Sequence, residues 1–235
     1  VTGCANRAAV SSDKLQVTRI GGIVGTHNAS TIDDCSNSGD ITLAYTATAN
    51  NWEAAGGIVG FYDGTDGTAV TNGCTVNSSN ANIGAGGIAG IIKSGNATNN
   101  TNDGAVWMHN AQAGKSSYAG GIVGYDYNTK DKSAVTGNVN NGAVQATVEG
   151  TSALLAAGGI IGRNDVGAVS GCRNFGAVAC ALHAGALVGW NKKSVEDSAA
   201  GGSVNGTALT GTNYAELAVG FQDGGSSSGI TFGEK

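Results

Sequence analysis

A pentapeptide of the form Gly-Gly-Ile-Val-Gly recurs along the chain and constrains the fold more than any other feature. Five clear copies, one variant and one weaker copy begin, in order, at Gly21, Gly56, Gly86, Gly120, Gly158, Gly185 and Leu217. Successive copies are separated by roughly 27 to 38 residues. Self-similarity at this period is typical of architectures in which one unit stacks on the next.

A second motif, Cys-x-Asn-x-Gly-x-Val, follows the pentapeptide after 10 or 14 residues in the clearest copies. Its Cys slot holds Cys4, Cys35, Cys74 and Cys172. Its Asn slot holds Asn6, Asn37, Asn102, Asn140 and Asn174. A loop that tolerates a four-residue insertion therefore separates two fixed segments.

The apolar runs are short and predict strands. Each run covers about four residues and is bounded by Gly, Asn, Ser or Asp, whereas helices need about ten or more periodic residues. The chain has 41 Gly and no Pro. Gly at that density disfavours helix interiors, and the absence of Pro suits strands whose backbone N–H groups all pair. We expect three strands per repeat, the first of them formed by the pentapeptide.

Three short strands per repeat, each closed by a turn, predict a single-stranded parallel β-helix, or β-solenoid, of about six to seven coils. We expect it to be right-handed, because parallel crossover connections almost always are. With coils about 4.8 Å apart, equivalent residues form ladders. The Asn slot would become a ladder of hydrogen-bonded amides, and the Cys slot a column of small packed side chains.

The cysteines leave two alternatives open. We expect buried free thiols, because side chains stacked in parallel approach each other poorly for bonding; the alternative is a Cys4–Cys35 or Cys35–Cys74 bridge between neighbouring coils. Cys180 lies outside the ladder and is expected in the core. No Cys-x-x-Cys pair indicates a metal site.

The whole chain, 1–235, is expected to be one elongated domain with units beginning near 21, 56, 86, 120, 158, 185 and 216. It begins in mid-repeat, and we expect a piece of a longer exported protein, with no obvious capping segment at either end. Charged residues make up 12% and the net charge is −5. Without a basic stripe or a long apolar run, neither nucleic-acid binding nor membrane insertion of this segment is expected.

These two motifs together resemble the GLUG-motif repeats. The copies at 21–25, 56–60, 120–124 and 158–162 fit best, while Ala89 and Ala186 depart from the pattern in two others. The resemblance implies an extracellular β-helical segment of a large bacterial protein, either adhesin-like or a non-catalytic part of an IgA-specific metallopeptidase. It implies a cell-surface or secreted location and no catalytic residue.

The residue after the pentapeptide is often aromatic, which suggests a stripe along the solenoid. The stripe and its neighbours comprise Phe61, Tyr62, Tyr125, Tyr127, Trp190 and Phe221. If they face solvent, such rings could bind a glycan or a surface protein. In the alternative they seal the core at a corner. Trp52 and Trp107 lie in other slots and would not join them.

Chemical sites are sparse. The oxygen-rich loop 63–68 contains Asp63 and Asp66, which could begin a calcium site, although a plain turn explains it as well; no other cofactor is expected. No catalytic motif occurs. We therefore expect a non-catalytic adhesin-like binding scaffold or stalk. A pure spacer without a ligand and a carbohydrate-active β-helix lyase or hydrolase are the alternatives.

Overall fold

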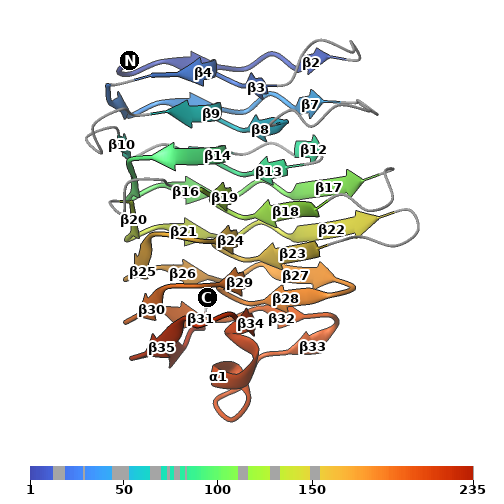
Figure 1. Cartoon of the computed structure of the whole chain (residues 1–235). Helices are drawn as coiled ribbons and strands as arrows, with labels where there is room; N and C mark the ends of the chain where they lie inside the picture. Colours follow the sequence, from blue (N-terminus) through green and yellow to red (C-terminus); the bar gives the residue numbers. More distant parts are fainter. Residues whose placement is uncertain are drawn as a thin grey trace.

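The chain forms a parallel β-solenoid in a computed structural model (Figure 1), which confirms the predicted fold class. The structure describes residues 1–12, 19–28, 30–43, 53–63, 70–72, 75–76, 80–82, 84–110, 116–127, 133–148 and 154–234. The side chains of Cys74 and Asp66 lie outside these residues. Within them, no helix is long and apolar enough to cross a bilayer.

Each coil contributes five short strands, not the predicted three, so five sheets run along the molecule. Sheet A comprises β5 (Ile32–Asp33), β10 (Val70–Asn72), β15 (Asn96–Thr98), β20 (Ala134–Thr136), β25 (Ala168–Ser170), β30 (Ser194–Glu196) and β35 (Ser226–Ser228). Sheet B comprises β1 (Ala5–Asn6), β6 (Ser36–Asn37), β11 (Thr75–Val76), β16 (Thr101–Asn102), β21 (Val139–Asn140), β26 (Arg173–Asn174), β31 (Ala199–Ala200) and β36 (Thr231–Phe232). These two sheets form one side of the outer wall.

Sheet C continues the outer wall, and sheets D and E fold back inside it. Sheet C comprises β2 (Val10–Ser12), β7 (Ile41–Leu43), β12 (Asn80–Asn82), β17 (Val106–Asn110), β22 (Val144–Val148), β27 (Ala177–Cys180), β32 (Ser203–Val204) and β33 (Thr207–Ala208). Sheet D comprises β3 (Arg19–Gly21), β8 (Ala54–Gly56), β13 (Gly84–Gly86), β18 (Ser116–Gly120), β23 (Leu154–Gly158) and β28 (His183–Gly185). Sheet E comprises β4 (Val24–His27), β9 (Val59–Asp63), β14 (Ala89–Ser94), β19 (Val123–Asp126), β24 (Ile161–Asn164), β29 (Val188–Asn191) and β34 (Val219–Gln222).

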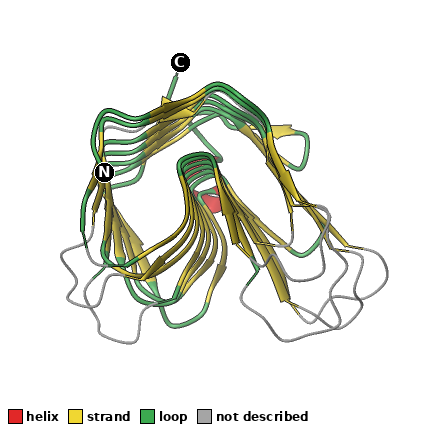
Figure 2. Cartoon of the chain, turned by 90° about the horizontal axis from the view of Figure 1, so that it is seen from above, coloured by secondary structure: helices red, strands yellow, loops and turns green. Residues whose placement is uncertain are grey.

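The pentapeptide is a turn between two strands, which corrects the prediction that it is one strand. Its first Gly ends a strand of sheet D and its Val begins a strand of sheet E. Seen along the axis, these turns stack in the middle of the cross-section, and the two sheets diverge from them like a wedge (Figure 2). From the N-terminal end the chain runs clockwise as it recedes, so the solenoid is right-handed (Figures 1 and 2).

Close backbone approach explains why this turn needs glycine. A Cβ on Gly121 would overlap the carbonyl oxygen of Gly159 in the next coil and the side-chain Cγ of Asn140. A Cβ on Gly124 would lie 2.6 Å from the oxygen of Gly90 and 2.7 Å from that of Ala85. The tip of the wedge therefore touches the Asn ladder of sheet B, so the two sequence motifs meet across the section.

The wedge divides the interior into two thin cores. One lies between sheets E and A and contains small apolar side chains such as Ile32, Ile122 and Val135. The other lies between sheets D and C and contains Met108, Val144 and Leu155 among others. Because each core is only two side chains deep, Ala, Val and Ile fill it, and the low aromatic content of 6% is sufficient.

The C-terminal end of the stack is partly covered, contrary to the expectation of no capping segment. Strand β33 pairs antiparallel with β32, the exception among the described pairings, which are otherwise parallel. The short helix α1 (Tyr214–Leu217) follows, and Leu209 and Leu217 pack against the core. Figure 1 places this helix at the C-terminal end of the solenoid. The hairpin thereby covers the edge of β32 in sheet C, whereas the helix lies against β31, β34 and β36.

Candidate binding surfaces

The residues after the pentapeptide stack in one column on the face of sheet E that is turned toward sheet D. The strand registers align Thr26, Phe61, Ile91, Tyr125, Arg163, Trp190 and Phe221. The column spans several strand spacings of about 4.8 Å each. It is therefore continuous, but its members differ in side-chain type and in burial.

Phe61 and Ile91, which follow the exposed Thr26 in this column, are buried. Phe61 is only 4% exposed and clusters with Ala54 and Ile91. The Arg19 guanidinium, from sheet D, lies 3.8 Å from the centre of the Phe61 ring. Tyr62 is fully buried in the core, where its hydroxyl donates to the carbonyl oxygen of Ser30 at 2.6 Å. Phe61 and Tyr62 are thus packing residues, as in the alternative in which the rings seal the core: Phe61 packs against sheet D and Tyr62 points into the core.

An arginine lies at the centre of the column. Arg163 Nη1 donates to the hydroxyl oxygen of Tyr118 at 2.7 Å, and Nε to Asp165 at 2.8 Å. The Tyr125 hydroxyl donates to the same carboxylate at 2.8 Å. Burial, followed by the charge of Asp165, holds the pKa of Tyr125 above its ordinary value. Tyr127 packs on Tyr125 with ring centres 5.5 Å apart. This network joins sheets D and E and leaves these rings only partly accessible.

At the C-terminal end of the column the aromatic side chains open to solvent. The Trp190 and Phe221 rings lie 4.5 Å apart, and His183 from sheet D lies 5.0 Å from each. Trp190 Nε1 donates to Asp223 at 3.2 Å, and Phe221 is 40% exposed. Burial lowers the pKa of His183. The continuous stripe expected from the sequence therefore narrows to a small patch.

The structure brings the Asn slots together as hydrogen-bonded ladders. Asn102 Nδ2 donates to Asn140 Oδ1 at 2.8 Å, and Asn140 donates to Asn174 in the same way. At the N-terminal end, Asn6 donates to Asn37 at 2.7 Å. Val76 occupies the Asn slot between Asn37 and Asn102, where the ladder therefore lacks a side-chain amide. Each ladder amide also closes its own turn, as when Asn140 Nδ2 donates to Gly142 O.

The cysteines of the described residues are all free thiols. Cys35, Cys172 and Cys180 are buried, whereas Cys4 at the first coil is exposed. Asn138 occupies the Cys slot one coil before Cys172 and contacts its sulfur at 3.8 Å. Burial raises the pKa of the Cys172 thiol. The thiols thus share their column with hydrogen-bonding residues, because the slot has room for either.

The calcium hypothesis stays a prediction. Asp63 ends β9, while the remainder of its loop, with Asp66, lies outside the described residues. In the described part of the chain, no group of three or more His, Cys, Asp or Glu side chains could hold a metal ion.

A buried acid that the sequence analysis did not single out lies at the end of β19. Asp126 is fully buried, and its Oδ2 accepts from the Ser133 hydroxyl at 2.6 Å and from the Gly167 N–H at 3.1 Å. Among the described residues, its Oδ1 has no hydrogen-bond partner. Burial raises the pKa of Asp126 to about 7. Asn164 occupies the same slot in the next coil.

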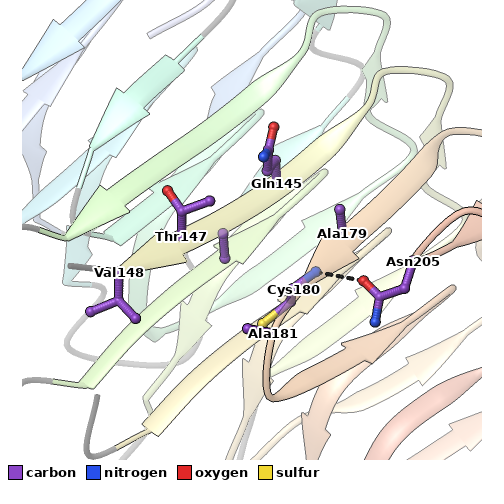
Figure 3. Close-up of a pocket in the computed structure, with 8 residues that line it drawn as sticks. Gln145, Thr147, Val148, Ala179, Cys180, Ala181 and Asn205 are labelled. Atoms are coloured by element: carbon purple, nitrogen blue, oxygen red, sulfur yellow. Dashed lines mark hydrogen bonds between the residues drawn. The ribbon is translucent and has the colours of Figure 1, made fainter. Parts of the chain in front are cut away.

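A second surface, on the outer face of sheet C, was also missed. Trp107 on β17 is 53% exposed. Next to it lies a shallow hollow of about 520 Å³ whose lining includes Gln145, Thr147, Ala179 and Asn205 (Figure 3). The alternation of Val106, Trp107 and Met108 along a strand was the available signal, since neighbours of an inward Val and Met must point outward.

Comparison with known families supports the resemblance found in the sequence. The GLUG motif model matches residues 17–42, which cover β3 to β7. This segment contains both sequence motifs and makes one full coil. Comparison of the chain with curated proteins and with solved structures gives no match. A GLUG motif within a parallel β-solenoid is thus what the chain contains.

Proposed function

We propose that this chain is a non-catalytic repeat segment of an exported bacterial cell-surface protein, where it acts as an adhesin-like binding scaffold or stalk. The GLUG match and the solenoid are compatible with that role. A stack of coils holds its loops and outer faces in a fixed order along one axis. Such an object suits the presentation of binding surfaces at a distance from an anchor.

The observation that carries the proposal is the continuity of the stacking. The five sheets contain six to eight strands each among the described residues, and backbone hydrogen bonds connect each coil to the next. Nearest-neighbour contacts of this kind resist bending, because each strand inside a sheet lies between two others. The outer surface is poor in charge and rich in neutral polar groups.

Surface digestion of intact source cells tests the location. Cells are treated briefly with trypsin, and the released peptides are identified by mass spectrometry beside a cytosolic marker protein. We expect peptides from the lysines and arginines of 1–235 before any marker peptide appears. Release of these peptides only together with the marker would refute surface exposure.

A stalk also has a mechanical consequence. We expect small-angle scattering of the isolated segment to give a rigid particle whose dimensions match the solenoid, at every protein concentration tested. A flexible or collapsed particle would contradict the scaffold role even if the protein is exported.

A further inference from the structure

Sheet C presents an uncharged outer face, which limits what could bind there. None of its described strands contains Asp, Glu, Lys or Arg. The face therefore offers no counter-charge to an anionic or cationic polymer. A neutral ligand that interacts through apolar surface and hydrogen bonds is the complementary chemistry.

Four residues on this face form one row along the solenoid axis. Trp107 is in register with Gln145, and Gln145 with Ala179. Asn205 follows Val204, which pairs with Val178, so it extends the row by one strand. The row crosses four adjacent strands, about 14 Å at a spacing of about 4.8 Å. Four sugar rings fit along the row when their centres lie about one strand spacing apart.

The row combines an exposed ring, a hollow and two amides. Trp107 supplies a flat apolar surface. The short side chain of Ala179 lies between the longer side chains of Gln145 and Asn205, and these three residues line the hollow described above together with Ala146, Val148 and Cys180, among others. Figure 3 shows Gln145 and Thr147 projecting from β22 on one side of it and Asn205 on the other. An amide both donates and accepts, as pairs of sugar hydroxyls require.

The polar groups are held in place by the fold. Asn205 Oδ1 accepts from the backbone N–H of Cys180 at 2.9 Å, and among the described residues no acceptor faces its Nδ2. Asn205 has φ 47° and starts the tight turn between β32 and β33. Thr147 Oγ1 lies 2.9 Å from His109 Nδ1, so these two side chains hold each other in place beside the row. Groups ordered before binding lose little entropy when a ligand arrives.

We propose that the outer face of sheet C binds a neutral polysaccharide whose chain runs along the solenoid axis, with one ring stacked on Trp107 and the following rings beside Gln145, over Ala179 and beside Asn205. This inference deepens the adhesin-like role proposed above, because it names the ligand class and the surface that takes it.

Binding to defined oligosaccharides tests the proposal. The probes are neutral hexasaccharides of β-1,4-glucan, β-1,4-mannan, β-1,4-xylan and chitin, and an anionic hexagalacturonate, each titrated into the intact segment by calorimetry. We expect at least one neutral probe to bind and the anionic probe not to bind. If no neutral probe binds, or if only the anionic one does, the proposal is wrong.

Two variants locate the site. Trp107→Ala removes the stacking ring and should weaken binding at least tenfold. Ala179→Arg fills the hollow from an outward-facing position and should weaken it similarly without disturbing the core. Leu182→Ala is the matched control, because Leu182 is also 53% exposed but lies outside the row; its affinity should stay within twofold of the parent.

Circular dichroism and thermal unfolding of each variant establish that the fold is retained. Unchanged affinity in both Trp107→Ala and Ala179→Arg would overturn the proposal even if the parent binds sugar. A surface-exposed protein that binds no probe would leave the scaffold role standing and refute only the glycan surface, whereas a protein that binds sugar but stays inside the cell would refute only the location.

Discussion

Replacing the buried Asp126 with Asn should stabilise the protein at neutral pH and remove a pH dependence. In the fold, the carboxyl is fully buried, and burial raises its pKa from 3.8 to about 7. Ser133 and Gly167 donate to Oδ2, while Oδ1 has no partner among the described residues. An Asn amide would keep the acceptor and place a neutral donor where Oδ1 now lies. Asn164 and Asn191, the residues in this slot in the next two coils, form such a ladder at 3.0 Å.

The direction in which stability changes with pH follows from the raised pKa of Asp126. Because the folded state holds the Asp126 proton more tightly than the unfolded state, the contribution of this carboxyl to the stability of the parent is greatest below pH 3.8 and falls as the pH rises toward 7. A difference of about three pKa units corresponds to about 4 kcal/mol, as an upper limit. The Asn variant does not titrate at this position. The stability difference between variant and parent should therefore grow by about 1.4 kcal/mol per pH unit across this window and become constant above about pH 7.

Urea denaturation followed by circular dichroism, at pH values from 4.5 to 8.5, measures this difference. All other acids titrate equally in both proteins and cancel in the comparison. Asp103→Asn is the control, since Asp103 is exposed in a turn and its replacement should change stability by less than about 0.5 kcal/mol. A difference between Asp126→Asn and the parent that stays constant over this pH range would refute the reasoning. So would a destabilised variant at pH 8.

Three further pairs of substitutions test the packing. Asn140→Ala should cost about 2–4 kcal/mol, because Asn140 bonds in both directions along its ladder, whereas Asn6→Ala at the exposed first coil should cost under about 1 kcal/mol, both measured by urea denaturation. Phe61→Ala should cost about 3–5 kcal/mol and Phe221→Ala under about 1 kcal/mol, because only the first is buried; equal thermal shifts would contradict this. Ala200→Asn alone should destabilise by about 1–3 kcal/mol through crowding against Ala186, and adding Ala186→Gly should recover most of the loss; additive effects in a double-mutant cycle would exclude contact between these slots.

The parallel stacking could be predicted because the motifs repeat with fixed internal spacing. Cys35 and Asn37 belong to one strand-turn segment, and their equivalents in later coils had to lie above them. The amide ladder follows from the same reasoning, since equivalent Asn side chains on adjacent parallel strands are within hydrogen-bonding reach.

The number of strands could not be predicted in the same way. Two strands of sheet D, Ala54–Gly56 and Gly84–Gly86, contain only Ala and Gly. They show neither alternation nor β-branched residues, so their sequence carries no strand signal. The pentapeptide looked like a strand on account of its Ile and Val, yet its backbone turns at the preceding Gly.

The candidate surfaces were harder to predict, because exposure depends on what lies opposite. Phe61 and Phe221 occupy the same slot, and the sequence gives no sign that sheet D covers one and leaves the other open. Trp107 was different. Its neighbours Val106 and Met108 point into a core, so its outward direction was implicit in the alternation, although it recurs in no other repeat.

The contact between the two motifs also explains a departure from the pattern. Gly159 lies so close to Asn174 that a Cβ would overlap the Asn side chain. In the following coil, Ala186 replaces the Gly and Ala200 replaces the Asn, and both are fully buried. The added methyl group thus occurs in the coil where the opposing amide is missing. In this coil the pentapeptide and the Asn motif depart from the pattern together, as expected if the two slots fill one shared volume.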